Sequence, residues 1–161
     1  MGAALAPMLV PGDVLSLSGE LGAGKTVIVQ GVARGLGVET RVTSPSFTLV
    51  HTYEGVFRIV HLDVYRLSSF QEVLDLGFDE LLDPQAIALV EWGEAVAPLL
   101  PRVHLEIDIR SASPELPSER TLEFRPRGPE WRARLARLEE VLPPGLKRSR
   151  GGDSGPPVAS S

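Results

Sequence analysis

The stretch that decides the fold runs Gly19-Glu20-Leu21-Gly22-Ala23-Gly24-Lys25-Thr26, or GELGAGKT. It matches the phosphate-loop pattern G-x-x-x-x-G-K-[ST] in full. At average amino-acid usage, the four fixed positions recur by chance in about one chain in two hundred of this length. An apolar run at residues 14–18 precedes the loop, and apolar residues at helical spacing follow it over residues 26–36. Strand, glycine-rich loop and helix in this order are the context that a P-loop requires.

Each residue type in this loop has a physical reason. Glycines let backbone N–H groups converge on phosphates, and the N-terminus of the following helix adds partial positive charge. Lys25 would reach the β- and γ-phosphates, and the Thr26 hydroxyl would ligate Mg²⁺. The chain has 14 arginines but only two lysines, Lys25 and Lys147. One of these two lysines therefore stands in the loop, where its compact ammonium charge suits a phosphate. We predict that all eight loop residues bind the nucleotide; the alternative is an ordinary glycine-rich turn.

Composition limits the remaining possibilities. With 161 residues, 43% of them hydrophobic, the chain is long enough for one domain with a core. It has no cysteine for a disulfide, a thiolate nucleophile or a zinc site. No apolar run approaches the roughly 20 residues that span a bilayer, and the first residues lack the basic flank of a signal peptide. We expect a cytoplasmic protein.

The formal net charge of −5 is unevenly distributed. Residues 1–123 contain 8 basic and 17 acidic residues, a balance of −9, which argues against a nucleic-acid-binding surface. Residues 124–150 contain 8 basic and 3 acidic residues, a balance of +5. This basic end could contact RNA or an acidic partner, or it could be a solvated helix face followed by a disordered tail.

Hydrophobic periodicity and turn residues predict one α/β domain over residues 1–142 and a disordered Pro-, Gly- and Ser-rich basic tail over residues 143–161. The predicted strands cover residues 14–18, 46–53, 56–65, 86–90, 103–109 and 121–124. The last two alternate in polarity and are expected to be antiparallel edge strands. The predicted helices cover residues 3–10, 26–36, 69–76, 79–82, 94–99 and 130–142.

A P-loop needs an acidic group on its magnesium side, usually at the end of a buried neighbouring strand. The run Ala86-Ile87-Ala88-Leu89-Val90 is apolar throughout, as in a strand buried on both faces, and Glu91 follows it directly. We therefore predict that Glu91 is the Walker B carboxylate. The alternative is that Glu91 merely begins the next helix.

The stretch His61-Leu62-Asp63-Val64-Tyr65-Arg66 has a polar residue at every second position. In a strand these alternate residues share one face, so His61, Asp63 and Tyr65 are expected opposite the apolar ones. Unpaired buried charge is costly, so this trio suggests a site in which Asp63 positions water or magnesium with His61 as a neighbour. A structural network that caps the strand end explains the pattern equally well. His51 and His104 are interpreted as ordinary strand residues.

The class of P-loop protein can be narrowed by what the chain lacks. It contains no asparagine and no Asp-x-x-Gly, which argues against a GTPase with an Asn-Lys-x-Asp guanine-reading element. An ATPase, a non-hydrolysing nucleotide-sensing docking module and a small-molecule P-loop kinase stay open. The polar loop Thr43-Ser44-Pro45-Ser46 could sense the γ-phosphate as a switch or could be a simple turn.

Four motifs in order, GDVLSLSGELGAGKT, VTSPSFTLVHTY, HLDVYR and ALVEWGE, resemble the TsaE family, the bacterial ATPase component of the tRNA threonylcarbamoyladenosine machinery. The resemblance covers residues 2–124. It implies a P-loop NTPase-like three-layer fold, a central parallel sheet flanked by antiparallel strands, with ATP and Mg²⁺ at the loop. It also implies a TsaD-type transferase and a TsaB-type partner, with ATP hydrolysis resetting their complex between rounds of modifying tRNA adenosine 37.

Site residues follow from the resemblance by motif position. It implies that Lys25 is a phosphate ligand, that Thr26 and Glu91 are magnesium ligands, and that Asp63 is an essential residue of the hydrolysis site. Lys25, Asp63 and Glu91 are therefore the expected catalytic set. Trp92 matches the family's tryptophan near the nucleotide.

The chain departs from the family pattern in three places. Val27 stands where a second threonine is common, and Ser46 stands where threonine is more usual. The family usually has a further strand and a threonine-bearing stretch ahead of Gly2, so we expect a truncated chain or a misassigned start, which mass spectrometry of the native protein would decide. No residue is an obvious arginine finger, Arg66 being the nearest candidate, so we expect a weak ATPase that a partner stimulates.

Overall fold

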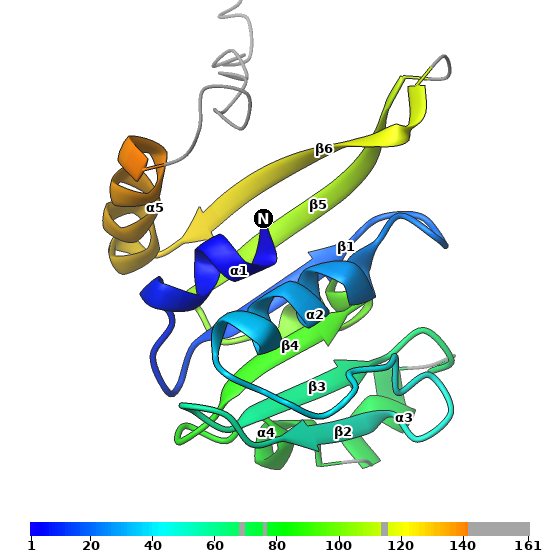
Figure 1. The fold of residues 1–161 in the computed structure, drawn as a ribbon. Helices are drawn as coiled ribbons and strands as arrows, with labels where there is room; N and C mark the ends of the chain where they lie inside the picture. Colours follow the sequence, from blue (N-terminus) through cyan, green and yellow to red (C-terminus); the bar gives the residue numbers. More distant parts are fainter. Residues whose placement is uncertain (68–69, 76, 114–115, 142–161) are drawn as a thin grey trace, which may run out of the picture.

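The structure is a computed structural model, and it describes residues 1–67, 70–75, 77–113 and 116–141. Six strands form one sheet in the order β2-β3-β4-β1-β5-β6 (Figure 1). The strands are β1 (Val14–Ser18), β2 (Val50–Tyr53), β3 (Ile59–Asp63), β4 (Ile87–Glu91), β5 (His104–Ser113) and β6 (Leu116–Arg127). The helices are α1 (Gly2–Leu5), α2 (Lys25–Gly35), α3 (Phe70–Asp75), α4 (Phe78–Leu81) and α5 (Pro129–Val141), with 3₁₀ turns η1 (Ala6–Met8) and η2 (Gly93–Leu99).

The sheet has a parallel centre and antiparallel edges. Strands β3, β4, β1 and β5 pair in parallel, whereas β2 pairs antiparallel with β3 and β6 pairs antiparallel with β5. All five residues of β4 are buried, as expected for a central strand covered on both faces. The fold class inferred from the sequence, a central parallel sheet flanked by antiparallel strands, is confirmed.

Two apolar cores hold the layers together. On one face, the strands pack against α1, α2 and α5 around residues such as Leu15, Leu89 and Trp131. On the other face, Val60, Leu62 and other strand residues pack against α3, α4 and η2. Figure 1 shows this sandwich, with α1, α2 and α5 in front of the sheet and α3 and α4 behind it. No helix in the described ranges has the length and apolar character needed to cross a membrane.

Most predicted elements lie within a few residues of those in the structure, but two predictions were wrong. The strand expected over residues 46–53 begins only at Val50, because residues 46–49 form a turn and Leu49 has a left-handed φ of 67°. The strand expected as an antiparallel edge at 103–109 is an interior strand parallel to β1. Residue 69 of the predicted helix 69–76, its last residue 76, residue 142 and the predicted tail 143–161 lie outside the described residues.

Candidate functional site

The candidate site lies where the parallel strands end. The glycine-rich loop follows β1, Asp63 ends β3, and Glu91 ends β4. The strand register places Glu91 beside both Leu17 of β1 and Asp63 of β3. In open α/β sheets, ligands bind at this carboxyl edge, which lies on the right in Figure 1.

The backbone of the loop depends on its glycines. Gly19, Gly22 and Gly24 have φ values of 133°, 78° and 107°, a region that side chains with a Cβ rarely adopt. At Gly19 a Cβ would also lie 2.3 Å from the carbonyl oxygen of Ile109 in β5. Helix α2 starts directly after the loop with no side-chain cap, so the structure leaves its N-terminus without the usual acceptor. This arrangement fits an anion.

Lys25 is held inside the loop. Its side chain is only 5% exposed, and its ammonium donates hydrogen bonds to the carbonyl oxygens of Gly19 at 2.6 Å and Glu20 at 2.9 Å. The same nitrogen lies 3.5 Å from the centre of the Trp92 ring, which is cation–π distance. Lys25 is therefore positioned by the residues that are predicted to bind the nucleotide with it.

Burial and neighbouring charges have opposite effects on the pKa values of Lys25 and Glu94. Burial lowers the pKa of its ammonium from the usual value, although the nearby carboxylates of Glu91, Glu94 and Asp63 oppose this change. Conversely, burial raises the pKa of the Glu94 carboxyl, and the charge of Lys25 opposes that rise. Lys25 is therefore a buried cation whose charge the surrounding carboxylates stabilise.

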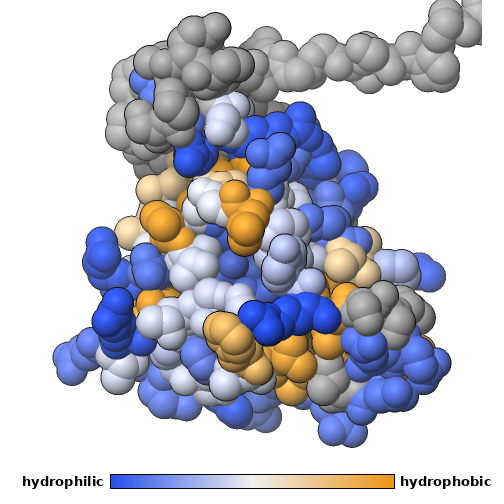
Figure 2. Space-filling model, turned by 90° about the vertical axis from the view of Figure 1, so that its right-hand side faces the viewer, coloured by the Kyte–Doolittle hydropathy of each residue, from blue (hydrophilic) through white to orange (hydrophobic). Residues whose placement is uncertain are grey.

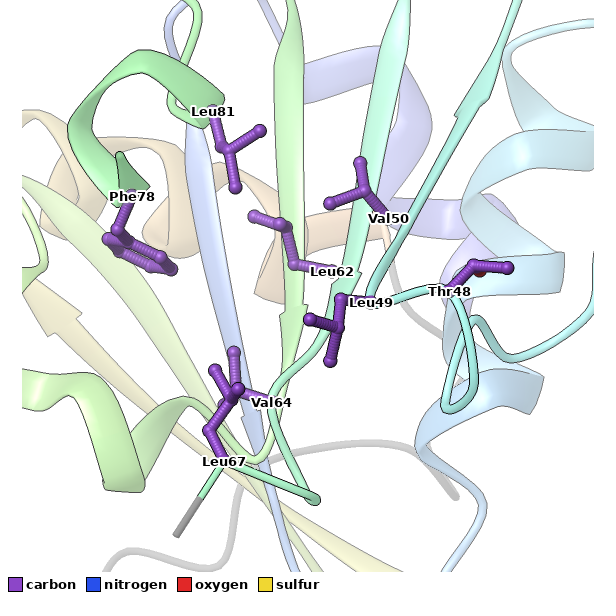
Figure 3. A pocket seen from close by; sticks show the side chains of 8 residues that line it. All are labelled: Thr48, Leu49, Val50, Leu62, Val64, Leu67, Phe78 and Leu81. Carbon is purple, nitrogen blue, oxygen red and sulfur yellow. The ribbon is translucent and has the colours of Figure 1, made fainter. Parts of the chain in front are cut away.

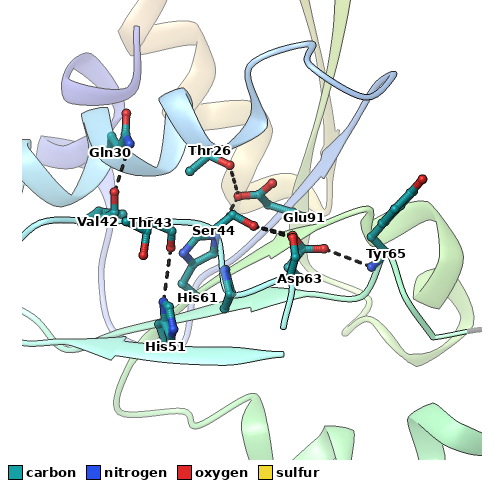
Figure 4. A network of polar contacts seen from close by, with 12 residues as sticks. Thr26, Gln30, Val42, Thr43, Ser44, His51, His61, Asp63, Tyr65 and Glu91 are labelled. Carbon is teal, nitrogen blue, oxygen red and sulfur yellow. Dashed lines mark hydrogen bonds and ion pairs between the residues drawn. The ribbon is translucent and has the colours of Figure 1, made fainter. Parts of the chain in front are cut away.

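Thr26, Glu91 and His61 form a connected group (Figure 4). The Thr26 hydroxyl donates to Oε1 of Glu91 at 2.8 Å, and Nε2 of His61 lies 2.8 Å from the same oxygen. The two predicted magnesium ligands are thus adjacent, although they are 65 residues apart in the chain. His61 pairs with Glu91, whereas the sequence had suggested it as a neighbour of Asp63.

Asp63 is buried and connects β3 to the polar loop before β2. Its Oδ2 accepts hydrogen bonds from the hydroxyls of Ser44 at 2.7 Å and Ser46 at 2.5 Å. Its Oδ1 accepts the backbone N–H of Tyr65 at 3.1 Å (Figure 4). These bonds explain why residues 46–49 turn instead of extending β2. The alternating faces predicted for His61 and Asp63 against Leu62 are confirmed, because Leu62 packs in the core on the opposite side.

Two contacts that involve aromatic rings lie next to site residues in the chain. The rings of Tyr65 and Trp92 lie 4.7 Å apart, and Trp92 has a left-handed φ of 62°. The guanidinium of Arg66, the nearest arginine-finger candidate in the sequence, lies 4.1 Å from the ring centre of Phe47. Arg66 is therefore stacked on Phe47, the residue that follows the polar loop.

Sequence reasoning missed two contacts of the loop. Arg120 on β6 donates from Nε to the carbonyl oxygen of Ala23 at 3.0 Å. No local pattern could have indicated this contact, because 97 residues separate the two. Glu94 interacts electrostatically with Lys25, and its place in the motif Glu91-Trp92-Gly93-Glu94 was an available signal.

A separate cavity lies on the other face of the sheet, below the loop that ends at Leu49 (Figure 3). Its lining is almost wholly apolar and consists of Thr48, Leu49, Val50, Leu62, Val64, Leu67, Phe78 and Leu81. It contains none of the predicted nucleotide-binding residues. The candidate site is therefore defined by the loop and the strand ends.

The parallel sheet and the glycine-rich loop at the end of its central strand β1 define the chain as a P-loop NTPase-like protein. The sequence model described as threonylcarbamoyl adenosine biosynthesis protein TsaE matches residues 1–122. The chain belongs to the TsaE family.

Similar proteins agree with this assignment. Proteins named tRNA threonylcarbamoyladenosine biosynthesis protein TsaE are 44% identical in Bacillus subtilis and 41% identical in Treponema pallidum. The first alignment covers 71% of this chain and 70% of the relative, and the second covers 68% and 81%. The crystal structure of Bacillus subtilis YdiB superposes with a TM-score of 0.73 at 36% identity, covering 86% of this chain and 84% of that one.

Proposed function

We propose that this protein binds ATP and Mg²⁺ and hydrolyses ATP, slowly alone and faster with its partners, in the threonylcarbamoyl modification of tRNA adenosine 37. Hydrolysis would reset a transferase complex in the cytoplasm. The observation that carries the proposal is that Lys25 is held by the loop carbonyl groups while the hydroxyl of the next residue, Thr26, bonds to Glu91; these are the residues that would hold the phosphates and the magnesium. Membership of the TsaE family supports the biological role.

Phosphate binding is assigned to the loop and Lys25. The ammonium would exchange its two carbonyl acceptors for phosphate oxygens, which are stronger partners because they carry charge. The uncapped N-terminus of α2 and the loop glycines would supply backbone N–H groups. Trp92, which already lies against the Lys25 ammonium, would border the bound nucleotide.

The magnesium ligands would be the Thr26 hydroxyl and the Glu91 carboxylate, which are hard oxygen donors of the kind that Mg²⁺ prefers. When bound, Mg²⁺ neutralises charge that develops on the β- and γ-phosphate oxygens. Most of the remaining coordination of such an ion normally comes from phosphates and water, so two protein ligands fit this metal.

Asp63 would hold the attacking water. One of its oxygens already accepts two hydroxyl bonds from Ser44 and Ser46, so the loop of residues 43–48 and the hydrolysis residue are coupled. While these bonds persist, that oxygen has little capacity left for a water molecule. If the attacking water binds at this oxygen, hydrolysis by the isolated protein would be slow, and displacement of the loop would accelerate it.

A partner could displace this loop directly. Leu21, Val27, Phe47 and Tyr65 are 76%, 65%, 84% and 52% exposed, and all belong to segments at the carboxyl edge of the sheet. Figure 2 looks onto this edge and shows apolar side chains among polar ones. Exposed apolar residues beside a site favour a docking partner. We assign this role to the TsaD-type transferase and the TsaB-type partner, through which the protein would meet tRNA.

Calorimetric titration with ATP and MgCl₂ tests the binding step. Lys25→Ala should lose detectable binding, because charge-assisted bonds of about 1.5–3 kcal/mol each disappear. Lys147→Ala, which removes the only other lysine, is the matched control and should bind as the unaltered protein does. Unchanged affinity in Lys25→Ala would refute the P-loop assignment. A docking module that senses nucleotide would bind ATP without releasing phosphate, and a kinase would transfer phosphate to an added metabolite.

A further inference from the structure

His61 occupies a position in β3 where an apolar side chain would be ordinary. It is 0% exposed, and its neighbours Val60 and Leu62 belong to the core on the opposite face. Its Nε2 lies 2.8 Å from Oε1 of Glu91. Its Nδ1 is buried and has no hydrogen-bond partner within the described part of the chain.

The role proposed for Glu91 sets the direction of this hydrogen bond. A carboxylate that binds Mg²⁺ can only accept, so Nε2 of His61 would carry the hydrogen and donate it to Glu91. Among the described residues the buried Nδ1 has no hydrogen-bond partner, and an unsatisfied buried polar atom costs about 1–3 kcal/mol. An apolar side chain at position 61 would fill the same space without the cost of burying Nδ1. What the histidine adds is its hydrogen bond to Glu91.

Glu91 is oriented by two donors on one oxygen. Thr26 and His61 both bond to Oε1, each at 2.8 Å, and Oε2 is bonded to neither of them. Thr26 is only half-buried, and its hydroxyl is the group assigned to magnesium. The His61 side chain is enclosed and makes no other hydrogen bond in the described ranges, so it is the donor that can hold the carboxylate throughout.

We propose that His61 is a positioning residue that orients the Glu91 carboxylate for Mg²⁺. The inference rests on the proposed function and adds a residue to it. Carboxylates that bind metals are themselves hydrogen-bonded, and losing such a partner typically costs 10–100-fold in metal affinity. His61 therefore acts through Glu91 and is not expected to touch the nucleotide.

Nucleotide titrations at increasing MgCl₂ and in EDTA test the inference. In His61→Leu, the Mg²⁺ concentration for half-maximal ATP binding should rise about 10–100-fold, with the affinity in EDTA unchanged. His61→Gln can offer an N–H near the position of Nε2 and should recover most of the loss. His104→Leu, in another strand, is a buried histidine control outside the site and should leave the Mg²⁺ midpoint unchanged.

The possible failures are distinguishable. If the unaltered protein binds no nucleotide in either buffer, the proposed function fails. If it binds with Mg²⁺ dependence and His61→Leu keeps the same dependence, the inference alone fails. Because His61→Leu could unfold, ¹⁵N NMR of the metal-free protein gives a second readout. It should show the hydrogen of His61 on Nε2, and a hydrogen on Nδ1 alone would overturn the inference.

Discussion

The substitution Gly93→Ala should lower both the stability of the fold and the affinity of the site, because the added Cβ would clash with Ser16. Gly93 begins η2, two residues after Glu91, and its φ lies outside the left-handed region. A Cβ there would lie 2.1 Å from Oγ, 2.9 Å from Cβ and 3.2 Å from Cα of Ser16, which is itself buried in β1. Separations of this size cannot persist, so β1 and η2 must move apart.

The magnitude follows from overpacking. Forcing extra methylenes into a packed core costs about 1–3 kcal/mol. For a chain of this size, that lowers the melting temperature by about 2–12 °C. Because Trp92 donates its backbone N–H to Leu17 of β1 at 2.8 Å, the displacement should also disturb the strand end that carries Glu91. Mg²⁺-dependent nucleotide affinity should therefore fall with stability.

A double-mutant cycle is the assay. Ser16→Gly removes the two nearest contact atoms, so Gly93→Ala should cost less than about 1 kcal/mol in that background. Chemical unfolding of the four proteins measures the coupling energy between the two positions. If the two substitutions destabilise the protein additively, the steric explanation is wrong.

Three other substitutions address the site. Asp63→Ala should keep ATP affinity within a few-fold but slow hydrolysis about 100-fold or more, and unchanged turnover in a phosphate-release assay would return Asp63 to a structural role. Arg120→Ala should weaken ATP binding about 2–10-fold in calorimetry, because the loop loses one hydrogen bond at Ala23. Burial raises the pKa of Glu94, so the folded state is penalised once pH rises above 4.5. Glu94→Gln should therefore raise the melting temperature at pH 7 and have little effect below pH 4.5; equal gains at both would contradict this.

Local sequence patterns predicted much of the site, because the periodicity of a strand or helix determines which side chains share a face. The apolar run before Glu91 and the alternation around Asp63 depend only on the two-residue period of a strand. Together they positioned both carboxylates at one sheet edge. The glycine pattern of the loop similarly reflects backbone conformations that other residues avoid.

Contacts between distant segments could not be predicted in this way. The turn at residues 46–49 forms because hydroxyls of Ser44 and Ser46 bond to Asp63, which removes them from strand pairing. The pairing of His61 with Glu91 depends on the register between β3 and β4. Strand β5 alternates in polarity although it is interior, because Glu106 and other charged residues on it form ion pairs with arginines of β6.

The most direct test of the central claim is a single-turnover ATP assay with and without the TsaD-type and TsaB-type proteins. Phosphate release is expected to be slow for the isolated protein and clearly faster in the complex. Lys25→Ala should release none above background in either condition. ATP binding without any phosphate release in the complex, or phosphate recovered on an added metabolite, would contradict the proposed role as a partner-stimulated ATPase.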